Sequence, residues 1–149
     1  MDNLIHLVCS RCGTVNRLPS ARLAHHPTCG KCGAGLVAEE PIVLDEQGLM
    51  RHIAKDGVPM VVDFWAPWCG PCRMMEPAYK AAAAQLAPHV RLGKLNTEEN
   101  QAIASRLGIR GIPTMILFDG GQEVARTSGA MDTRSIVAWV RQNVGRHAA

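Results

Sequence analysis

Apolar residues are distributed in two different ways along the chain. Beyond residue 41 they form short continuous runs and helical repeats, whereas residues 1–36 show only a weak periodic pattern among many turn formers. The weak pattern is typical of a segment that cannot bury a core unaided. A small polar stretch closed by Pro41 separates the two regions, as expected at a boundary. We therefore predict an N-terminal domain over 1–36, a linker over 37–41 and a larger domain over 42–149.

The larger domain is predicted to alternate strands and helices. Short apolar runs indicate strands, and apolar residues three and four positions apart indicate helices. The predicted strands are 42–44, 60–65, 90–95, 114–118 and 123–127, and the predicted helices are 45–55, 71–86, 98–107 and 132–144. This order predicts an α/β fold with a mixed sheet flanked by helices. Pro77 should kink the second helix, because its ring clashes with the preceding turn.

Composition and charge exclude several functional classes. With 47% apolar residues in 149, the chain can bury a sizeable core, and its net charge of +3 is spread over scattered basic residues with only 4% aromatics. These values argue against nucleic-acid binding. No apolar stretch approaches the ~20 residues of a membrane helix. The first ten residues contain Asp2 and His6 and lack a basic start, so we expect no signal peptide and a cytoplasmic protein that binds no membrane. We also expect a monomer.

Four of the six cysteines form a predicted zinc site in the N-terminal domain. Cys9 and Cys12 are followed, after sixteen residues, by Cys29 and Cys32, within the window of four-cysteine zinc sites. Each pair encloses one basic residue, which offsets thiolate charge, and precedes a glycine, which permits the positive φ of a tight turn. We therefore predict a zinc ribbon that holds one Zn²⁺ and no organic cofactor. Four protein ligands leave no open position, so this zinc should be structural.

Other interpretations of these four cysteines stay open. They could form two disulfides, or they could be redox-active thiols without metal. His25 or His26, in the intervening loop, could replace a cysteine ligand, although all four cysteine positions are filled. Oxidation of the four thiolates could also release the zinc and loosen the domain.

The third Cys-x-x-Cys pair has a different context. Cys69 and Cys72 lie between the apolar strand 60–65 and the helix that follows, framed by Trp65 and Trp68. Free N–H groups and the dipole at a helix N-terminus stabilise a thiolate, so Cys69 should be the nucleophile. Cys72 lies one turn further and should be less exposed. We predict that Cys69 forms a mixed disulfide with a substrate, which Cys72 then resolves.

Two further residues are candidates for this chemistry. Asp63 is an acid within an apolar strand, either satisfied by a neighbour at an edge or cap, or buried with a raised pKa. In the second case it could take the Cys72 proton. Lys94, on the neighbouring predicted strand, is a candidate partner for Asp63. Pro113 precedes a strand and suggests a tight turn, for which a cis peptide is one of two options.

Residues 41–149 resemble the thioredoxin family along their whole length. The matching stretches are 62–66 (VDFWA), 68–72 (WCGPC), 94–96 (KLN), 108–114 (GIRGIPT) and 128–130 (SGA). With the zinc-ribbon N-terminus, the chain is similar to the two-domain bacterial branch, thioredoxin 2. The resemblance implies a thioredoxin fold, with a central mixed five-stranded sheet flanked by helices, beside a small zinc-ribbon domain.

The resemblance also implies the roles of individual residues. Cys69 would be the nucleophile, Cys72 the resolving thiol, and Asp63 the buried acid with Lys94 nearby. Pro113 would be a cis-proline that faces the dithiol. The apolar patch that docks substrate chains would consist of Trp68, Gly111, Ile112, Pro113, Gly129 and Ala130. Pro67 departs from the family, where this position is often acidic or polar, and should affect partner preference only modestly.

The implied activity is reduction of protein disulfides by a cytoplasmic enzyme. The resemblance implies an NADPH-dependent thioredoxin reductase as electron donor and disulfide-containing proteins as clients. We expect this chain not to bind the nucleotide itself. The alternative is a redox- and zinc-sensing binding module in which the ribbon recruits partners.

Overall fold

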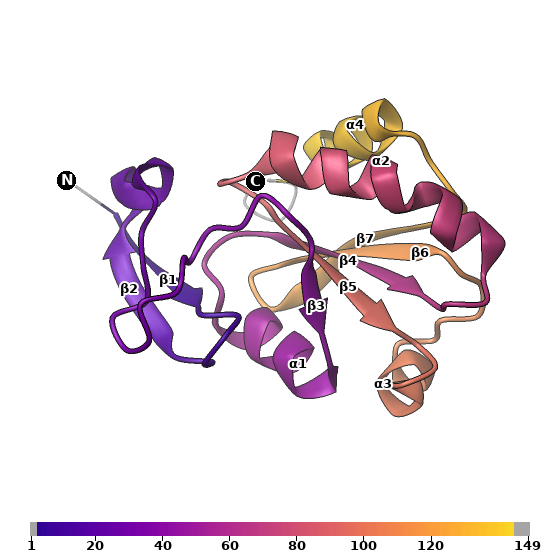
Figure 1. The fold of residues 1–149 in the computed structure, drawn as a ribbon, viewed down its shortest axis with the longest axis horizontal. Coiled ribbons are helices and arrows are strands. Elements are labelled where there is room, and N and C mark those ends of the chain that lie inside the picture. Colours follow the sequence, from indigo (N-terminus) through magenta and orange to yellow (C-terminus); the bar gives the residue numbers. More distant parts are fainter. Residues whose placement is uncertain (1–2, 145–149) are drawn as a thin grey trace.

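The structure is a computed structural model that describes residues 3–144, so the predicted domain ends at 1–2 and 145–149 lie outside the described residues. Two sheets are present, of two and five strands. The smaller one lies at one end of the molecule, and the larger one lies between two layers of helices (Figure 1). We call residues 3–36 the N-terminal region and residues 42–144 the sheet region.

The N-terminal region is an antiparallel pair of strands with a short helical turn and two loops. β1 (Leu4–Val8) pairs with β2 (Val15–Pro19), and the 3₁₀ helix η1 (Ser20–His25) follows. An isolated bridge joins Thr28 and Gly35. The core cluster of the N-terminal region is small and consists of Leu7, Cys9, Leu18, Leu23, Cys29 and Leu36, and Val8 is buried as well. So small a core contributes little stability on its own.

The larger sheet has five strands in the order β3-β5-β4-β6-β7. Their bounds are β3 (Ile42–Leu44), β4 (Met60–Trp65), β5 (Arg91–Asn96), β6 (Thr114–Asp119) and β7 (Gln122–Ser128). β3, β5 and β4 run parallel, whereas β6 is antiparallel to β4 and β7 to β6. The sheet is therefore mixed and five-stranded, which confirms the predicted fold class.

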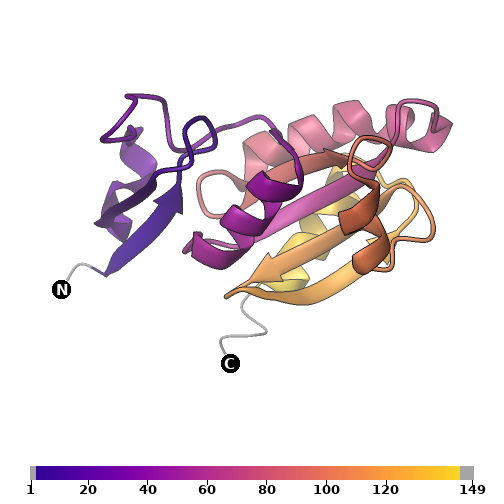
Figure 2. The same ribbon diagram turned by 90° about the horizontal axis from the view of Figure 1, so that it is seen from below.

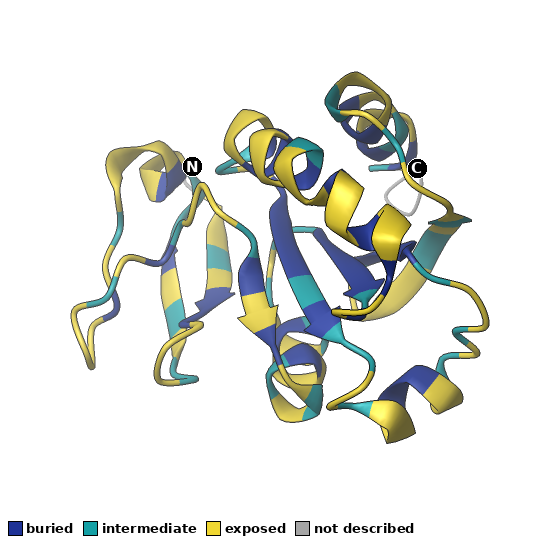
Figure 3. Ribbon diagram, turned by 45° about the vertical axis from the view of Figure 1, so that its right-hand side comes forward, coloured by how far each residue is buried: buried dark blue, intermediate teal, exposed yellow. Residues whose placement is uncertain are grey.

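Helices cover both faces of this sheet. They are α1 (Glu46–Lys55), α2 (Gly70–Leu86), α3 (Gln101–Arg106) and α4 (Thr133–Asn143). α2 and α4 lie on one face and α1 and α3 on the other (Figures 1 and 2). The central strands are buried along almost their whole length (Figure 3), because alternate side chains of β4 and β6 enter the two cores. Among the described residues, no helix has the length and apolar character needed to span a bilayer.

Helix ends follow the polar residues that cap them. The side chain of Asp45 accepts the N–H of Gly48 at the start of α1, as predicted from the sequence. α3 begins later than predicted, at Gln101 rather than Glu98. The Asn96 side chain accepts the Glu98 N–H at 2.9 Å and holds this segment in a turn. Pro77 lies inside α2, as expected.

Candidate functional site

The Cys69/Cys72 pair lies where β4 gives way to α2. Cys69 is the N-cap residue of α2, and its Sγ accepts the N–H of Cys72 at 3.2 Å. The two cysteines form a disulfide with their Cα atoms 5.3 Å apart, and both are buried. When the pair is reduced, this position offers the Cys69 sulfur an N–H donor and the positive end of the helix dipole. Both stabilise a thiolate.

The loop before β6 faces the dithiol. The Ile112–Pro113 peptide is cis, and the Ile112 carbonyl oxygen lies 3.8 Å from Cys69 Sγ. The carbonyl of Pro113 accepts the N–H of Gly129 at 2.9 Å, which holds the end of β7 against this loop. Of the predicted docking residues, Ile112 contacts the dithiol, Gly111 precedes it in the same loop, and Gly129 is joined to that loop through the Pro113 carbonyl. Ala130 is exposed and follows Gly129 directly.

Trp68 is the most exposed aromatic side chain near the dithiol. It is 68% exposed, and its indole Nε1 donates a hydrogen bond of 2.6 Å to Glu98 Oε1. This carboxylate fixes the orientation of an otherwise free indole. Glu98 could not be predicted as its partner from the sequence, since it lies 30 positions from Trp68 and belongs to no recognised motif.

Asp63 is a buried acid on β4. Its side chain is 5% exposed, and Oδ1 has no hydrogen-bond partner among the described residues. Burial raises the pKa of Asp63 to about 7, with a lowering contribution from Lys94 and a smaller raising one from Glu76. Lys94 neighbours Asp63 in the parallel register of β4 and β5. However, its ion pair is with Glu76, at 3.9 Å, so the direct pairing with Asp63 that the sequence suggested is absent from the described ion pairs.

A cavity connects Asp63 with the dithiol. Its volume is about 260 Å³, and its lining includes Asp63, Cys72, Glu76 and Lys94. This space is large enough for several water molecules, which can carry a proton between a carboxyl and a thiol. Glu76 lies one helical turn after Cys72 on the same face of α2. This four-residue spacing is the sequence signal that could have predicted Glu76 as a neighbour of the dithiol.

The four remaining cysteines form one cluster in the N-terminal region. Their four Sγ atoms all lie within 4.8 Å of one another, and both Cys9–Cys32 and Cys12–Cys29 are 3.6 Å apart. A tetrahedron of thiolates around Zn²⁺, with Zn–S near 2.3 Å, has edges of about 3.8 Å. The donor set and its spacing therefore fit zinc. All four are free cysteines, so the two-disulfide interpretation finds no support among the described residues.

Backbone turns and nearby N–H groups prepare these thiols for a cation. Gly13 and Gly33 have φ of 81° and 77°, as the sequence predicted for the two turns. N–H groups of Cys32, Asn16 and Lys31 lower the pKa of Cys29 to about 6. Although the Ala34 N–H opposes the shift, burial and the neighbouring thiols raise the pKa of Cys32 to about 11. Since the neighbouring thiols raise the pKa of Cys32, all four cysteines become thiolates together only when a cation lies among them.

The two histidines of the intervening loop do not join this cluster. His25 ends η1, and His26 follows it with a left-handed backbone. Neither belongs to the described group of metal-ligating side chains, which contains the four cysteines alone. The structure therefore gives no support to a histidine ligand in place of a cysteine.

Comparison with known proteins covers both regions of the chain. The family model "Thioredoxin" matches residues 40–142, and the model "Thioredoxin 2, N-terminal", a zinc ribbon, matches residues 8–34. Thioredoxin C-3 of Corynebacterium nephridii is 41% identical over 138 residues, which cover 93% of this chain and 94% of the relative. Thioredoxin 1 of Synechococcus elongatus is 46% identical over 54% of this chain and 76% of its own.

A solved structure gives the same result for the fold. A thioredoxin mutant from Halobacterium salinarum superimposes with a TM-score of 0.65 at 32% identity. The alignment covers 72% of this chain and 93% of that one.

Proposed function

Because this chain belongs to the thioredoxin family and is a thiol–disulfide oxidoreductase, we propose that Cys69 and Cys72 carry out its chemistry by reducing disulfides in other proteins. The observation that supports this assignment is the position of Cys69 as N-cap of α2, where its sulfur accepts the Cys72 N–H. Among the described cysteines it is this pair, and not the cluster of four, that lies beside an exposed aromatic side chain and a cis-proline loop.

The reaction consists of two exchanges. The Cys69 thiolate attacks one sulfur of a substrate disulfide, so that a Cys69–substrate bond forms and the other substrate sulfur leaves as a thiolate and takes up a proton. Cys72 then loses its proton and attacks Cys69, which releases the second substrate thiol and leaves the Cys69–Cys72 disulfide. Two electrons have passed to the substrate. An NADPH-dependent thioredoxin reductase returns them to the protein.

Asp63 accepts the proton of Cys72 in the second exchange. A pKa of about 7 leaves a substantial fraction of the carboxyl ionised at neutral pH, as a general base requires. The cavity beside Cys72 provides the route, and the charge of Lys94 favours the ionised form. Pro113 presents the Ile112 carbonyl to the incoming chain. The apolar surface of Trp68, Gly111, Ile112, Gly129 and Ala130 docks that chain.

One Zn²⁺ is held by Cys9, Cys12, Cys29 and Cys32. When bound, it neutralises thiolate charge and ties the two turns together, and with four protein ligands it has no open position for catalysis. The division into a zinc ribbon (1–36), a linker (37–41) and a thioredoxin domain (42–149) follows from this assignment. Four unpaired thiols suit a reducing compartment such as the cytoplasm. The alternative of a purely sensing module is not favoured by the family comparisons.

Kinetics on a protein disulfide test this function. With thioredoxin reductase and NADPH, the wild type should oxidise NADPH in proportion to the disulfide reduced, and Cys69→Ser should not. Cys72→Ser should trap a covalent mixed disulfide with the substrate, visible by mass spectrometry. Turnover by Cys69→Ser at the wild-type rate would show that the reaction does not use this dithiol.

A further inference from the structure

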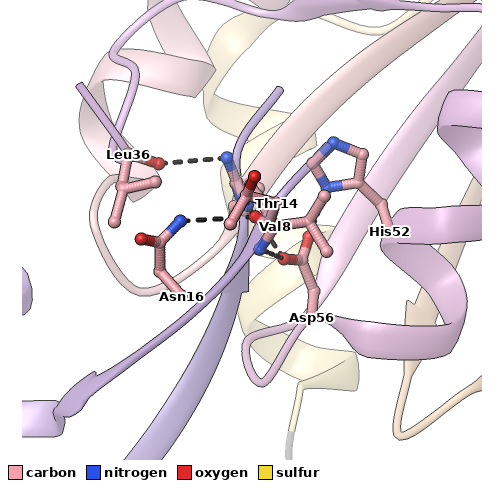
Figure 4. Close-up of polar contacts among 7 residues, drawn as sticks. Val8, Thr14, Asn16, Leu36, His52 and Asp56 are labelled. Atoms are coloured by element: carbon pink, nitrogen blue, oxygen red, sulfur yellow. Dashed lines mark hydrogen bonds and ion pairs between the residues drawn. The ribbon is translucent and has the colours of Figure 1, made fainter. Parts of the chain in front are cut away.

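The N-terminal region is fastened to the sheet region along the free edge of β1. The N–H of Gly57 donates to the His6 carbonyl at 2.7 Å, and the N–H of Val8 donates to Asp56 Oδ1 at 2.8 Å. The side chains of Asp56 and His52 and the residues Val8 and Leu36 converge at this junction (Figure 4). The backbone groups at the edge of β1 are thus satisfied by the turn that follows α1.

Arg91 is at the centre of the junction. It is the first residue of β5 and is 7% exposed. Its guanidinium donates to the Val8 carbonyl at 2.9 Å and to the Leu36 carbonyl at 3.0 Å, and it pairs with Asp56 at 2.9 Å. Asp56 in turn lies 2.6 Å from His52. A single side chain of the sheet region therefore bonds two separate backbone segments of the N-terminal region.

These two segments lie on either side of the cysteine cluster. Val8 immediately precedes Cys9, and Leu36 follows Cys32 by four residues. The carbonyls that Arg91 bonds thus belong to the chain entering the first cysteine turn and the chain leaving the second. Its two terminal nitrogens share the work: one donates to the Val8 carbonyl and Asp56, and the other to the Leu36 carbonyl. A lysine ammonium has all its donors on one freely rotating nitrogen, so it cannot reproduce this planar, two-nitrogen geometry.

We propose that Arg91 is a positioning residue for the zinc site, which holds the two cysteine turns at the separation that four-fold coordination needs. The inference rests on the zinc binding proposed above. Without the Arg91 contacts, the N-terminal region would have to order both cysteine turns when zinc binds. The free energy needed for that ordering would lower the affinity for zinc. With Arg91 in place, part of the ordering is already achieved by docking on the sheet region. Zinc affinity is then a property of the whole chain.

The test compares two arginine-to-lysine variants of the full chain. Arg91→Lys keeps the charge beside Asp56 but replaces the two nitrogens that bond the two carbonyls with a single one. Arg126→Lys is the matched control. Arg126 also bonds a carboxylate, Glu123 at 2.7 Å, and a backbone carbonyl, Leu107 at 2.8 Å, but it lies on the edge strand β7, which β4 and β6 separate from β5. Zinc affinity is measured by competition with a chromophoric chelator, and protein-disulfide reduction reports that the sheet region is folded.

We expect Arg91→Lys to weaken zinc binding by about tenfold or more, a size typical of residues that orient metal ligands. Arg126→Lys should match the wild type. Equal zinc affinities in the three proteins would overturn the inference and leave the zinc site itself intact. A wild type that binds no zinc would instead overturn the proposed zinc site together with the inference.

Gly57→Ala provides a second route if Arg91→Lys does not fold. A Cβ at Gly57 would lie 3.0 Å from the His6 carbonyl oxygen, so it displaces the edge of β1 without changing Arg91. Weaker zinc binding by this variant, with disulfide reduction retained, supports the inference. Zinc affinity equal to that of the wild type overturns it.

Discussion

Two cysteine sites with the same Cys-x-x-Cys spacing lie at opposite ends of the molecule and are built for opposite purposes. The dithiol lies at the start of α2, far from the N-terminal region that holds the cluster of four (Figure 1). Cys69 and Cys72 form a pair joined by a disulfide, beside a docking surface. In the cluster, by contrast, each sulfur has three others within 4.8 Å. What differs is the surrounding structure: a helix N-terminus activates one sulfur, whereas paired turns direct four sulfurs to one point.

Serine variants should separate the two sites most strongly. Cys69→Ser should lower disulfide reduction by more than about 1,000-fold, because the nucleophile is lost, and should leave zinc content at one per chain. Cys12→Ser should abolish stoichiometric zinc and leave Cys69 and Cys72 able to react. Turnover assays with metal analysis measure both. Loss of zinc from Cys69→Ser would contradict the separation of the two sites.

Zinc removal should loosen one end of the molecule only. Zinc at a 100-fold excess over its Kd stabilises a folded state by about 2.7 kcal/mol, so a chelator should accelerate amide hydrogen exchange in the N-terminal region. The Gly57 N–H, which bonds the His6 carbonyl, should lose protection with it. The Cys72 N–H at the dithiol should not change. Uniform loss of protection over both regions would show that they unfold as one unit.

Asp63 should make the dithiol end sensitive to pH. Its pKa is raised from 3.8 to about 7, so the folded protein retains a proton that the unfolded chain loses. The contribution of Asp63 to the free energy of unfolding is therefore largest below pH 4 and falls as pH rises to 7, because the buried carboxyl must then lose its proton. An amide at this position has no proton to lose. The free energy of unfolding of Asp63→Asn should therefore equal that of the wild type near pH 4 and exceed it at pH 8 by up to about 4 kcal/mol. Denaturant titrations at several pH values measure this, with Asp119→Asn in the β6–β7 hairpin as control.

The same Asp63→Asn variant should be slower in catalysis. Without a base beside Cys72, the second exchange depends on direct ionisation of that thiol, so its rate should fall by about 100-fold at pH 7 and recover as pH rises. Stopped-flow measurement of mixed-disulfide decay follows this step. A pH-independent rate identical to that of the wild type would exclude Asp63 as the base.

Weakening the Trp68–Glu98 hydrogen bond should have the smallest effect. Glu98→Gln removes the charge that strengthens a contact on an exposed side chain, and such contacts contribute about 0.5–1 kcal/mol. We expect KM for a protein disulfide to rise about threefold with kcat unchanged. Steady-state kinetics on a small disulfide, which does not need the docking surface, provides the control. A large fall in kcat would indicate a role in the chemistry itself.

Features encoded by neighbouring residues could be predicted from the sequence. The apolar run 60–65 predicted β4 with its bounds, Asp45 predicted the N-cap of α1, and the two glycines after the cysteine turns have the expected positive φ. The clustering of Cys9, Cys12, Cys29 and Cys32 at one site could be predicted because the two turns that carry them repeat the same local pattern. In all these cases, the deciding interaction lies within a few positions along the chain.

Features that depend on distant residues could be recognised only in the tertiary structure. Glu76 took the ion pair with Lys94 that was suggested for Asp63, and Glu98 fixed Trp68 across a loop. The residues around Ala87 and Pro88 did not predict that the peptide bond between them is cis. Arg91 gives the clearest example. From the sequence pattern, Arg91 is predicted only to lie at the start of a strand. In the structure its side chain donates a hydrogen bond to the carbonyl of Val8, 83 positions away.

The physical reason is the cost of burying charge. Local patterns of polarity and turn chemistry determine which segments become strands, helices and cysteine turns in this protein, and so they determine its two cysteine sites. A buried guanidinium is stable only where carbonyl and carboxylate oxygens from several segments surround it. Only the packing of the N-terminal region on the sheet region brings Val8, Leu36 and Asp56 together around Arg91.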